Sequence, residues 1–261
     1  MSKLTAAIEA VHAADKKAFV PYIMAGDGGL QKLRPTILKL QQLGVTAIEV
    51  GIPFTDPVAD GPTIEEAGYR ALKEGATLRS VLEELASFRD DITVPLVAMT
   101  YLNPILAYGV ELFAIDAKEA GIEGVIVPDM PLEESAIIHD TLRDEGIDLV
   151  QLVSLTSSPE RIQKLTAASE GFVYAVTVNG ITGARQAFEK QLQSHFAQLA
   201  SYTTKPILAG FGISTPAQVQ SLGAMCNGVI VGSKIVDALT RDDWATIEAL
   251  VQAAQATAAS S

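Results

Sequence analysis

Short apolar runs alternate with longer amphipathic stretches along the whole chain. The runs are strand-sized and rich in Val, Ile, Leu and Ala: Ala18–Met24, Ala47–Val50, Pro95–Tyr101, Gly124–Pro128, Leu149–Ser154, Phe172–Thr177, Pro206–Ala209 and Val229–Gly232. Strands that alternate with helical segments are typical of a parallel sheet covered by helices.

The stretches between the runs have helical spacing of their apolar positions: Leu30–Leu43, Leu78–Phe88, Leu112–Ala120, Leu132–Glu145, Pro159–Ala168 and Pro216–Leu222. Further helices are expected at Lys3–Ala14 and Asp243–Ala254. The pattern predicts an α/β fold, a (β/α)₈ TIM barrel with an extra N-terminal helix. A doubly wound open sheet is the alternative, but Ala25–Gly29 after the first strand lacks the G-x-G-x-x-G spacing of dinucleotide-binding sheets.

Length and composition agree with one barrel. The chain has 261 residues, near the roughly 250 of a typical barrel, and no linker divides it, so we expect residues 1–261 to form a single domain. Its 31 acidic and 19 basic residues give a net charge of −12, which argues against nucleic acid and anionic membranes as partners. A phosphorylated substrate is still compatible, because backbone N–H groups at helix N-termini bind phosphate.

The cysteine content and the lack of long apolar runs indicate where in the cell the protein is expected. Cys226 is the only cysteine, which excludes an internal disulfide and a cysteine-rich metal site. No apolar run resembles a signal peptide or a membrane span. We therefore expect a soluble, cytoplasmic protein.

Glu49 is the strongest candidate for chemistry. Because side chains alternate along a strand, Ala47 and Glu49 are expected to point into the barrel, and Ile48 and Val50 to point outward. A carboxylate buried at the barrel mouth should have a raised pKa, suited to proton transfer near neutral pH. A Glu that turns to solvent or pairs with an Arg is the alternative.

Asp60 follows in the proline-rich loop after the same strand. It could cap the helix that begins after Pro62. Its place on the same strand–helix unit as Glu49 favours a second carboxylate in one site, at the C-terminal end of the barrel where such enzymes act.

Three glycine-bearing loops follow the late strands, at Asn179–Gly183, Gly210–Ile213 and Gly232–Ser233. Glycine lets backbone N–H groups approach a ligand closely, and barrels often bind phosphate after strands seven and eight. Aromatic and thioether side chains expected near the mouth would add an apolar pocket: Tyr22, Met99, Tyr101, Met130, Tyr174 and Phe211.

The missing residue types narrow the chemistry. His12, His139 and His195 all fall on predicted helices or their ends, so we expect surface histidines and no His-ligated metal. Lys205 precedes the seventh strand and Lys234 begins the last helical segment, so no lysine is expected where an imine would form. A C–C bond cleavage would then require a substrate that supplies its own electron sink.

Several motifs resemble the α subunit of tryptophan synthase, in order along essentially the whole chain. They are Phe19–Gly26, Glu49–Pro62, Tyr101–Pro104, Pro128–Pro131, Gly180–Gly183 and Gly210–Ser214, of which Glu49–Pro62 is the most specific. The resemblance implies a barrel that cleaves indole-3-glycerol phosphate to indole and glyceraldehyde 3-phosphate without a cofactor.

The resemblance also implies residue roles. Glu49 would be the general acid/base, Asp60 would accept from the indole N–H, and Tyr174 would be the active-site tyrosine. The resemblance assigns phosphate binding to Gly183, Gly212, Gly232 and Ser233, and places Thr182 in a loop that closes over the site and contacts Asp60. Tyr22, Tyr101 and Phe211 are expected to bind the substrate from the apolar pocket at the mouth. The chain departs from the pattern with Thr177-Val178-Asn179 in place of a loop bearing serine and arginine, and with Tyr22 where phenylalanine is usual.

The family's partner is the pyridoxal-phosphate-dependent β subunit. The resemblance implies an α₂β₂ complex, docked through Pro53–Pro57, Asn103–Tyr108 and Asp129–Glu133. Three other readings stay open: another enzyme on a phosphate-binding barrel, a stand-alone indole-3-glycerol-phosphate lyase, and a barrel that mainly activates or scaffolds the β subunit.

Overall fold

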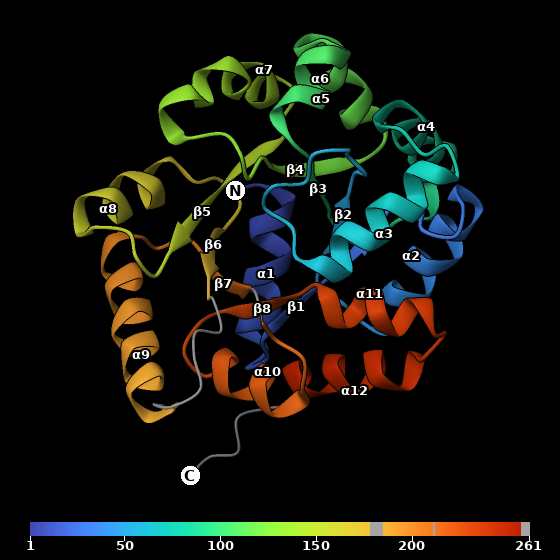
Figure 1. Ribbon diagram of the computed structural model, residues 1–261. Helices are drawn as coiled ribbons and strands as arrows, with labels where there is room; N and C mark the ends of the chain where they lie inside the picture. Colours follow the sequence, from blue (N-terminus) through green and yellow to red (C-terminus); the bar gives the residue numbers. More distant parts are fainter. Residues whose placement is uncertain (178–184, 211, 257–261) are drawn as a thin grey trace.

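The computed structural model describes residues 1–177, 185–210 and 212–256. Within them, parallel strands pair in sequence order and the last pairs with the first, which closes a barrel (Figure 1). The strands are β1 (Ala18–Met24), β2 (Ile48–Gly51), β3 (Leu96–Met99), β4 (Ile122–Ile126), β5 (Asp148–Ser154), β6 (Val173–Val176), β7 (Ile207–Gly210) and β8 (Gly228–Val231). The predicted TIM barrel is confirmed.

Helices surround the barrel, except for α1, which lies inside their ring in the view of Figure 1. They are α1 (Lys3–Ala13), α2 (Leu33–Gln42), α3 (Pro62–Lys73), α4 (Leu78–Ser87), α5 (Leu102–Tyr108), α6 (Val110–Glu119), α7 (His139–Asp144), α8 (Pro159–Ala168), α9 (Arg185–Tyr202), α10 (Pro216–Gly223), α11 (Ser233–Thr240) and α12 (Trp244–Gln255). Short 3₁₀ turns are η1 (Leu30–Lys32), η2 (Arg89–Asp91) and η3 (Leu132–Ile137).

The single helix expected at Leu132–Glu145 is wrong. The segment forms the 3₁₀ turn η3 and then the short helix α7, separated at Ile138. Ile138 leaves the helical conformation, with φ −124°, and its side chain is fully buried. The backbone bends where this side chain enters the core, which apolar spacing alone does not reveal.

The strands bury both of their faces. Ala47, Val97 and Ile126 lie in a cluster inside the barrel, whereas Ile48 and Val50 pack in the larger cluster between strands and helices. Alternation along β2 therefore places Glu49 on the inner face, as predicted.

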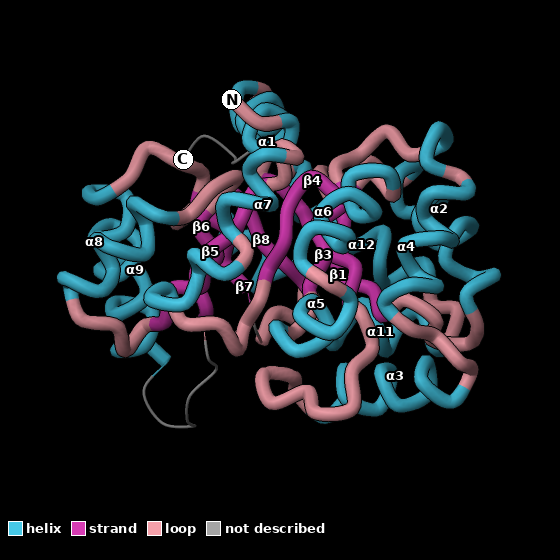
Figure 2. The backbone as a smooth tube through the Cα atoms, turned by 90° about the horizontal axis from the view of Figure 1, so that it is seen from above, coloured by secondary structure: helices cyan, strands magenta, loops and turns pink. Residues whose placement is uncertain are grey.

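Helix α1 closes one end of the barrel. Its Leu4 and Ile8 are fully buried in the inner cluster, and the Leu4 side chain would collide with a Cβ added to Gly171. Figure 2 shows α1 at one end of the strands, and α3 with the loop that precedes it at the other. With α1 covering the N-terminal ends of the strands, the open end is the C-terminal one.

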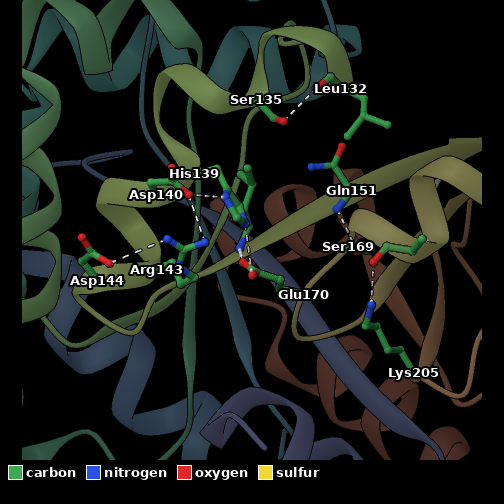
Figure 3. A network of polar contacts seen from close by, with 12 residues as sticks. Leu132, Ser135, His139, Asp140, Arg143, Asp144, Gln151, Ser169, Glu170 and Lys205 are labelled. Carbon is green, nitrogen blue, oxygen red and sulfur yellow. Dashed lines mark hydrogen bonds and ion pairs between the residues drawn. The ribbon is translucent and has the colours of Figure 1, made fainter.

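The expectation of surface histidines holds for His12, which is exposed, but not for the other two. His195 is buried, which lowers the pKa of its ring. His139 is partly buried and lies in a polar network that joins α7 to the segment before β6 (Figure 3). Its Nε2 lies 3.2 Å from Oε1 of Glu170, whose other oxygen accepts from the Leu149 N–H at 2.9 Å. Neither His139 nor His195 lines the cavity at the C-terminal ends of the strands.

Candidate active site

A cavity of about 360 Å³ opens at the C-terminal ends of the strands. Its walls come from strands and from the loops that follow them, so residues far apart in sequence meet there. The lining residues are Tyr22, Glu49, Ala59, Asp60, Gly61, Thr63, Ile64, Met99, Ile126, Pro128, Leu152, Tyr174, Gly212, Ile213, Ser214, Ile230, Gly232, Ser233, Lys234 and Asp237. Both predicted carboxylates belong to this one cavity.

Glu49 projects into the cavity from β2. It is 2% exposed, and its Oε2 is buried without a hydrogen-bond partner in the described part of the chain. Burial raises the pKa of Glu49 to about 8, and the negative charge of Asp60 adds to the rise. A buried carboxyl with a free oxygen is held protonated near neutral pH and can donate to a bound substrate.

Asp60 does not cap the following helix. The N-cap of α3 is Gly61, without a side-chain cap hydrogen bond. Asp60 lines the cavity instead, where burial raises its pKa to about 6, while a hydrogen bond with Tyr101 acts to lower it. The two carboxyl groups of the cavity therefore differ in proton affinity, because Asp60 is only partly buried and Glu49 is fully buried.

Tyr101 supports the loop that carries Asp60. Its hydroxyl oxygen accepts from the Ala59 N–H at 3.0 Å, and the same hydroxyl is hydrogen-bonded to the Asp60 carboxylate. Its ring packs against Phe54 with centroids 5.3 Å apart. Tyr101 does not itself line the cavity, so it acts behind Asp60 rather than on a ligand directly.

Tyr22 and Tyr174 stand in the cavity over glycines of neighbouring strands. A Cβ added to Gly51 on β2 would collide with the Tyr22 hydroxyl, and one added to Gly210 on β7 would collide with the Tyr174 hydroxyl. Burial raises the pKa of both tyrosines well above its ordinary value. Both hydroxyls therefore stay protonated beside Glu49.

The glycine-bearing side of the cavity is formed by Gly212 and by Gly232, which is the N-cap of α11. Gly212 has φ +74°, a left-handed conformation that favours glycine. Ser233 is exposed and begins α11, whose first turn carries N–H groups without intrahelical acceptors. The start of α10 is closed differently, because the Gln218 side chain accepts from the Ser214 N–H at 2.8 Å.

The remaining residues expected at the mouth differ in where they lie. Thr182, Gly183 and Phe211 lie outside the described residues. Met99 lines the cavity as expected, but Met130 lines a separate hollow beside β5. Sequence reasoning missed Lys234, which it placed at the start of a helix and away from the mouth. The signal was its position directly after Ser233, in the first turn of α11.

Two other features are absent from the described residues. No group of three or more His, Cys, Asp or Glu side chains there is arranged to hold a metal ion. No helix in those residues has both the length and the apolar character needed to span a membrane.

Comparisons with known proteins agree with one another. The family model described as "Tryptophan synthase alpha chain" matches residues 8–260. A Bacillus cereus protein named "Tryptophan synthase alpha chain" is 49% identical over 94% of this chain and 95% of its own length. A tryptophan synthase structure from Mycobacterium tuberculosis superposes with a TM-score of 0.89 at 32% identity, covering 98% of this chain and 99% of that one. The alpha subunit from Campylobacter jejuni gives 0.83 at 34% identity, covering 92% and 96%.

Proposed function

The chain belongs to the tryptophan synthase alpha chain family, and from that membership we propose how its mouth cavity performs the family's reaction. It is a carbon–carbon lyase of tryptophan biosynthesis that cleaves indole-3-glycerol phosphate. The proposal concerns the residues that do so, the order of proton transfers, and the partner.

The observation that carries the proposal is the pair of carboxyl groups with separated proton affinities. Glu49, whose pKa burial raises to about 8, enters the reaction as the acid. Asp60, whose pKa burial raises only to about 6, enters as the carboxylate. Two carboxyl groups set apart in this way can act as acid and base in one turnover.

In the first step the Glu49 carboxyl protonates C3 of the indole ring. The ring becomes an indoleninium cation, and Asp60 stabilises its charge by accepting a hydrogen bond from the indole N–H. In the second step the Glu49 carboxylate takes the proton from the side-chain hydroxyl next to the breaking bond. The electrons of that C–C bond return to the ring, so indole and glyceraldehyde 3-phosphate leave and Glu49 has regained a proton.

We assign the phosphate group to the side of the cavity formed by Gly212, Gly232 and Ser233. The Ser233 hydroxyl and the N–H groups of the first turn of α11 are suitable donors to an anion. The resemblance implies substrate roles for Thr182 and Gly183, and the sequence suggests one for Phe211; these three residues lie outside the described chain.

Apolar and aromatic side chains hold the indole ring. Met99, Ile126 and Leu152 line the inner wall between the two carboxyl groups and the barrel core. Tyr22 and Tyr174 lie beside Glu49, and Tyr101 fixes Asp60 from behind. Apolar surroundings keep Glu49 protonated and exclude water that would compete for the indoleninium ion.

Glu49→Gln tests the proposed acid. Glutamine keeps the size of the side chain but has no transferable carboxyl proton, so kcat for indole release should fall at least about 10²-fold. Binding of glycerol 3-phosphate should persist, since Glu49 does not contact the phosphate side. Glu119→Gln, on the exposed face of α6, is the matched control and should leave kcat unchanged. A Glu49→Gln enzyme with near-normal kcat would overturn the mechanism.

We also propose that the chain works in an α₂β₂ complex with a β subunit. The solved structures it resembles include structures of tryptophan synthase from Mycobacterium tuberculosis, one of them an aminoacrylate-bound form. The loop between β2 and α3 lies at the open end of the barrel (Figure 2) and exposes Val58 by 81%. An exposed apolar side chain on the loop that carries Asp60 suits a contact by which a partner controls the site.

A further inference from the structure

One cationic side chain reaches the wall of the mouth cavity. Among the described residues that line it, the ionisable acids and bases other than tyrosines are Glu49, Asp60, Asp237 and Lys234, so Lys234 is the only cation. It is partly buried, and no ion pair within 4.0 Å engages it in the described part of the chain. A lysine in this position has a charge available for a ligand.

The helix position of Lys234 allows its side chain to approach the proposed phosphate position. Lys234 is the second residue of α11, directly after Ser233 and the N-cap Gly232. The Cα–Cβ bonds of a helix tilt toward its N-terminus, so a lysine in the first turn leans back past the helix start. The ammonium group can then reach an anion held at Gly232 and Ser233.

The charges of the cavity make such a cation useful. Asp237 is paired with Arg241. With Asp237 paired, the other negative charge of the cavity is that of Asp60. Glu65 lies close enough to Asp60 to raise the pKa of the Asp60 carboxyl. The whole chain adds a net charge of −12. A phosphate dianion that binds here is repelled by this negative charge. Neutral N–H donors stabilise the phosphate by hydrogen bonds, but they add no positive charge.

We propose that Lys234 is a substrate-binding residue whose ammonium group neutralises part of the phosphate charge of indole-3-glycerol phosphate. This inference rests on the proposed function and extends its phosphate side by one residue. Because the phosphate takes no part in bond cleavage, Lys234 should stabilise the bound substrate and the transition state equally. Its loss should therefore appear in KM and leave kcat nearly unchanged.

A structural role is the competing explanation. Lys234 also lies within electrostatic reach of Asp243, the N-cap of α12. Hydrogen bonds from Thr246 are the larger cause of the lowered pKa of Asp243, and the charge of Lys234 adds to them. If this contact were the main role of Lys234, its removal would change the unfolding temperature and leave ligand binding unchanged.

The test compares Lys234→Gln and Lys234→Arg in the full-length enzyme. Lys16→Gln is the control, because it removes the same charge from an exposed position just before β1, at the closed end of the barrel. We measure kcat and KM for indole-3-glycerol phosphate, and the dissociation constants of glycerol 3-phosphate and of indole at two salt concentrations. The unfolding temperature is recorded for each variant.

Lys234→Gln should raise KM and the dissociation constant of glycerol 3-phosphate about 5- to 20-fold, the range of a partly solvated charge-assisted contact. Indole binding and kcat should stay within about twofold of wild type, since neither depends on the phosphate charge. The variant should also lose part of the salt dependence of phosphate binding. Lys234→Arg should restore most of the affinity.

The outcomes separate this inference from the proposed function. If wild type binds glycerol 3-phosphate but Lys234→Gln binds it equally well, the role of Lys234 is overturned and the phosphate site stands. If the loss is equal for Lys16→Gln, a general charge effect replaces the specific one. If wild type does not bind glycerol 3-phosphate at all, the phosphate side of the proposed function fails together with Lys234.

Discussion

Two carboxyl groups of the same cavity acquire different proton affinities from their surroundings. Glu49 lies on a strand inside the barrel, where its Oε2 is buried and has no hydrogen-bond partner among the described residues. Asp60 lies on a loop, half-buried and hydrogen-bonded to Tyr101. The strand therefore holds the group that must keep its proton, and the loop holds the group that must be ionised.

The pH dependence of activity should reflect this difference. The reactive form has Asp60 ionised and Glu49 protonated, so kcat/KM should be bell-shaped, rising near pH 6 and falling near pH 8. Asp60→Asn should lower the rate and remove the acidic limb from the residual activity. Steady-state rates of indole release between pH 5 and 9.5 measure both limbs. A kcat/KM that does not fall above pH 8 would contradict the acid role of Glu49.

Burial of Glu49 should also make stability depend on pH. Its pKa is 4.5 in an unfolded chain and about 8 in the folded one, so the folded state binds the proton more tightly. The stability this contributes is complete below pH 4.5 and is lost as the pH rises through 8. At pH 9 the ionised group costs up to about 5 kcal/mol relative to low pH, because each unit of the pKa difference corresponds to about 1.4 kcal/mol.

Glu49→Gln should remove this pH dependence. The free energy of unfolding of wild type should fall relative to the variant between pH 5 and 9, and Glu119→Gln should follow wild type. Urea titrations at a series of pH values give the difference directly. A constant difference across this range would mean that Glu49 titrates in the folded protein much as it does in water.

At the scale of elements, the strands shape the cavity through paired positions on neighbours. Tyr22 on β1 lies over Gly51 on β2, and Tyr174 on β6 lies over Gly210 on β7. In each pair one strand supplies a tyrosine and the neighbouring strand supplies a glycine. Because the glycine has no side chain, the tyrosine ring can lie over it. The strand pairing thus fixes where both hydroxyls stand beside Glu49.

Gly51→Ala should disturb the site more than the fold. Its methyl group would meet the Tyr22 ring and hydroxyl, and overpacking of this kind costs roughly 1–3 kcal/mol. We expect kcat/KM to fall at least about tenfold, because the displaced ring lies beside Glu49. The double variant Gly51→Ala/Tyr22→Phe removes the closest colliding atom and should recover part of the loss. An unimpaired Gly51→Ala enzyme would show that Tyr22 does not need this position.

Sequence reasoning worked best for the strands. Most strand positions are buried, so the strands are written mainly in apolar residues, and the alternation that places Glu49 inward needs no tertiary information. It failed where packing overrides spacing. Apolar periodicity continues through Leu132–Glu145, yet buried Ile138 ends the 3₁₀ turn. Met130 was expected at the mouth but lines a separate hollow, whereas Lys234 was not expected there and lines the mouth cavity. Strand and helix periodicity does not fix the direction of a side chain in a loop or at a helix start.

At the scale of the whole molecule, the barrel separates stability from chemistry. Helix α1 fills the closed end with Leu4 and Ile8, and the open end carries the carboxyl groups on β2 and its loop. The loop that holds Asp60 also exposes Val58. A protein that docks at the open end would contact a segment that is covalently continuous with the site, so docking and catalysis can be coupled through Asp60.

Indole release with and without a tryptophan synthase β subunit tests this coupling. The isolated chain should release indole slowly, and the β subunit should raise kcat at least about tenfold by holding the Asp60 loop in its reactive position. Val58→Asp should weaken this activation and leave the basal rate intact, since Val58 does not line the cavity. Tyr202→Asp, at the end of α9 and 37% exposed, is the control and should be activated normally. Fast indole release at a rate that the β subunit does not change would identify a stand-alone lyase. If the chain releases no indole but activates the β subunit, a scaffold role is favoured instead.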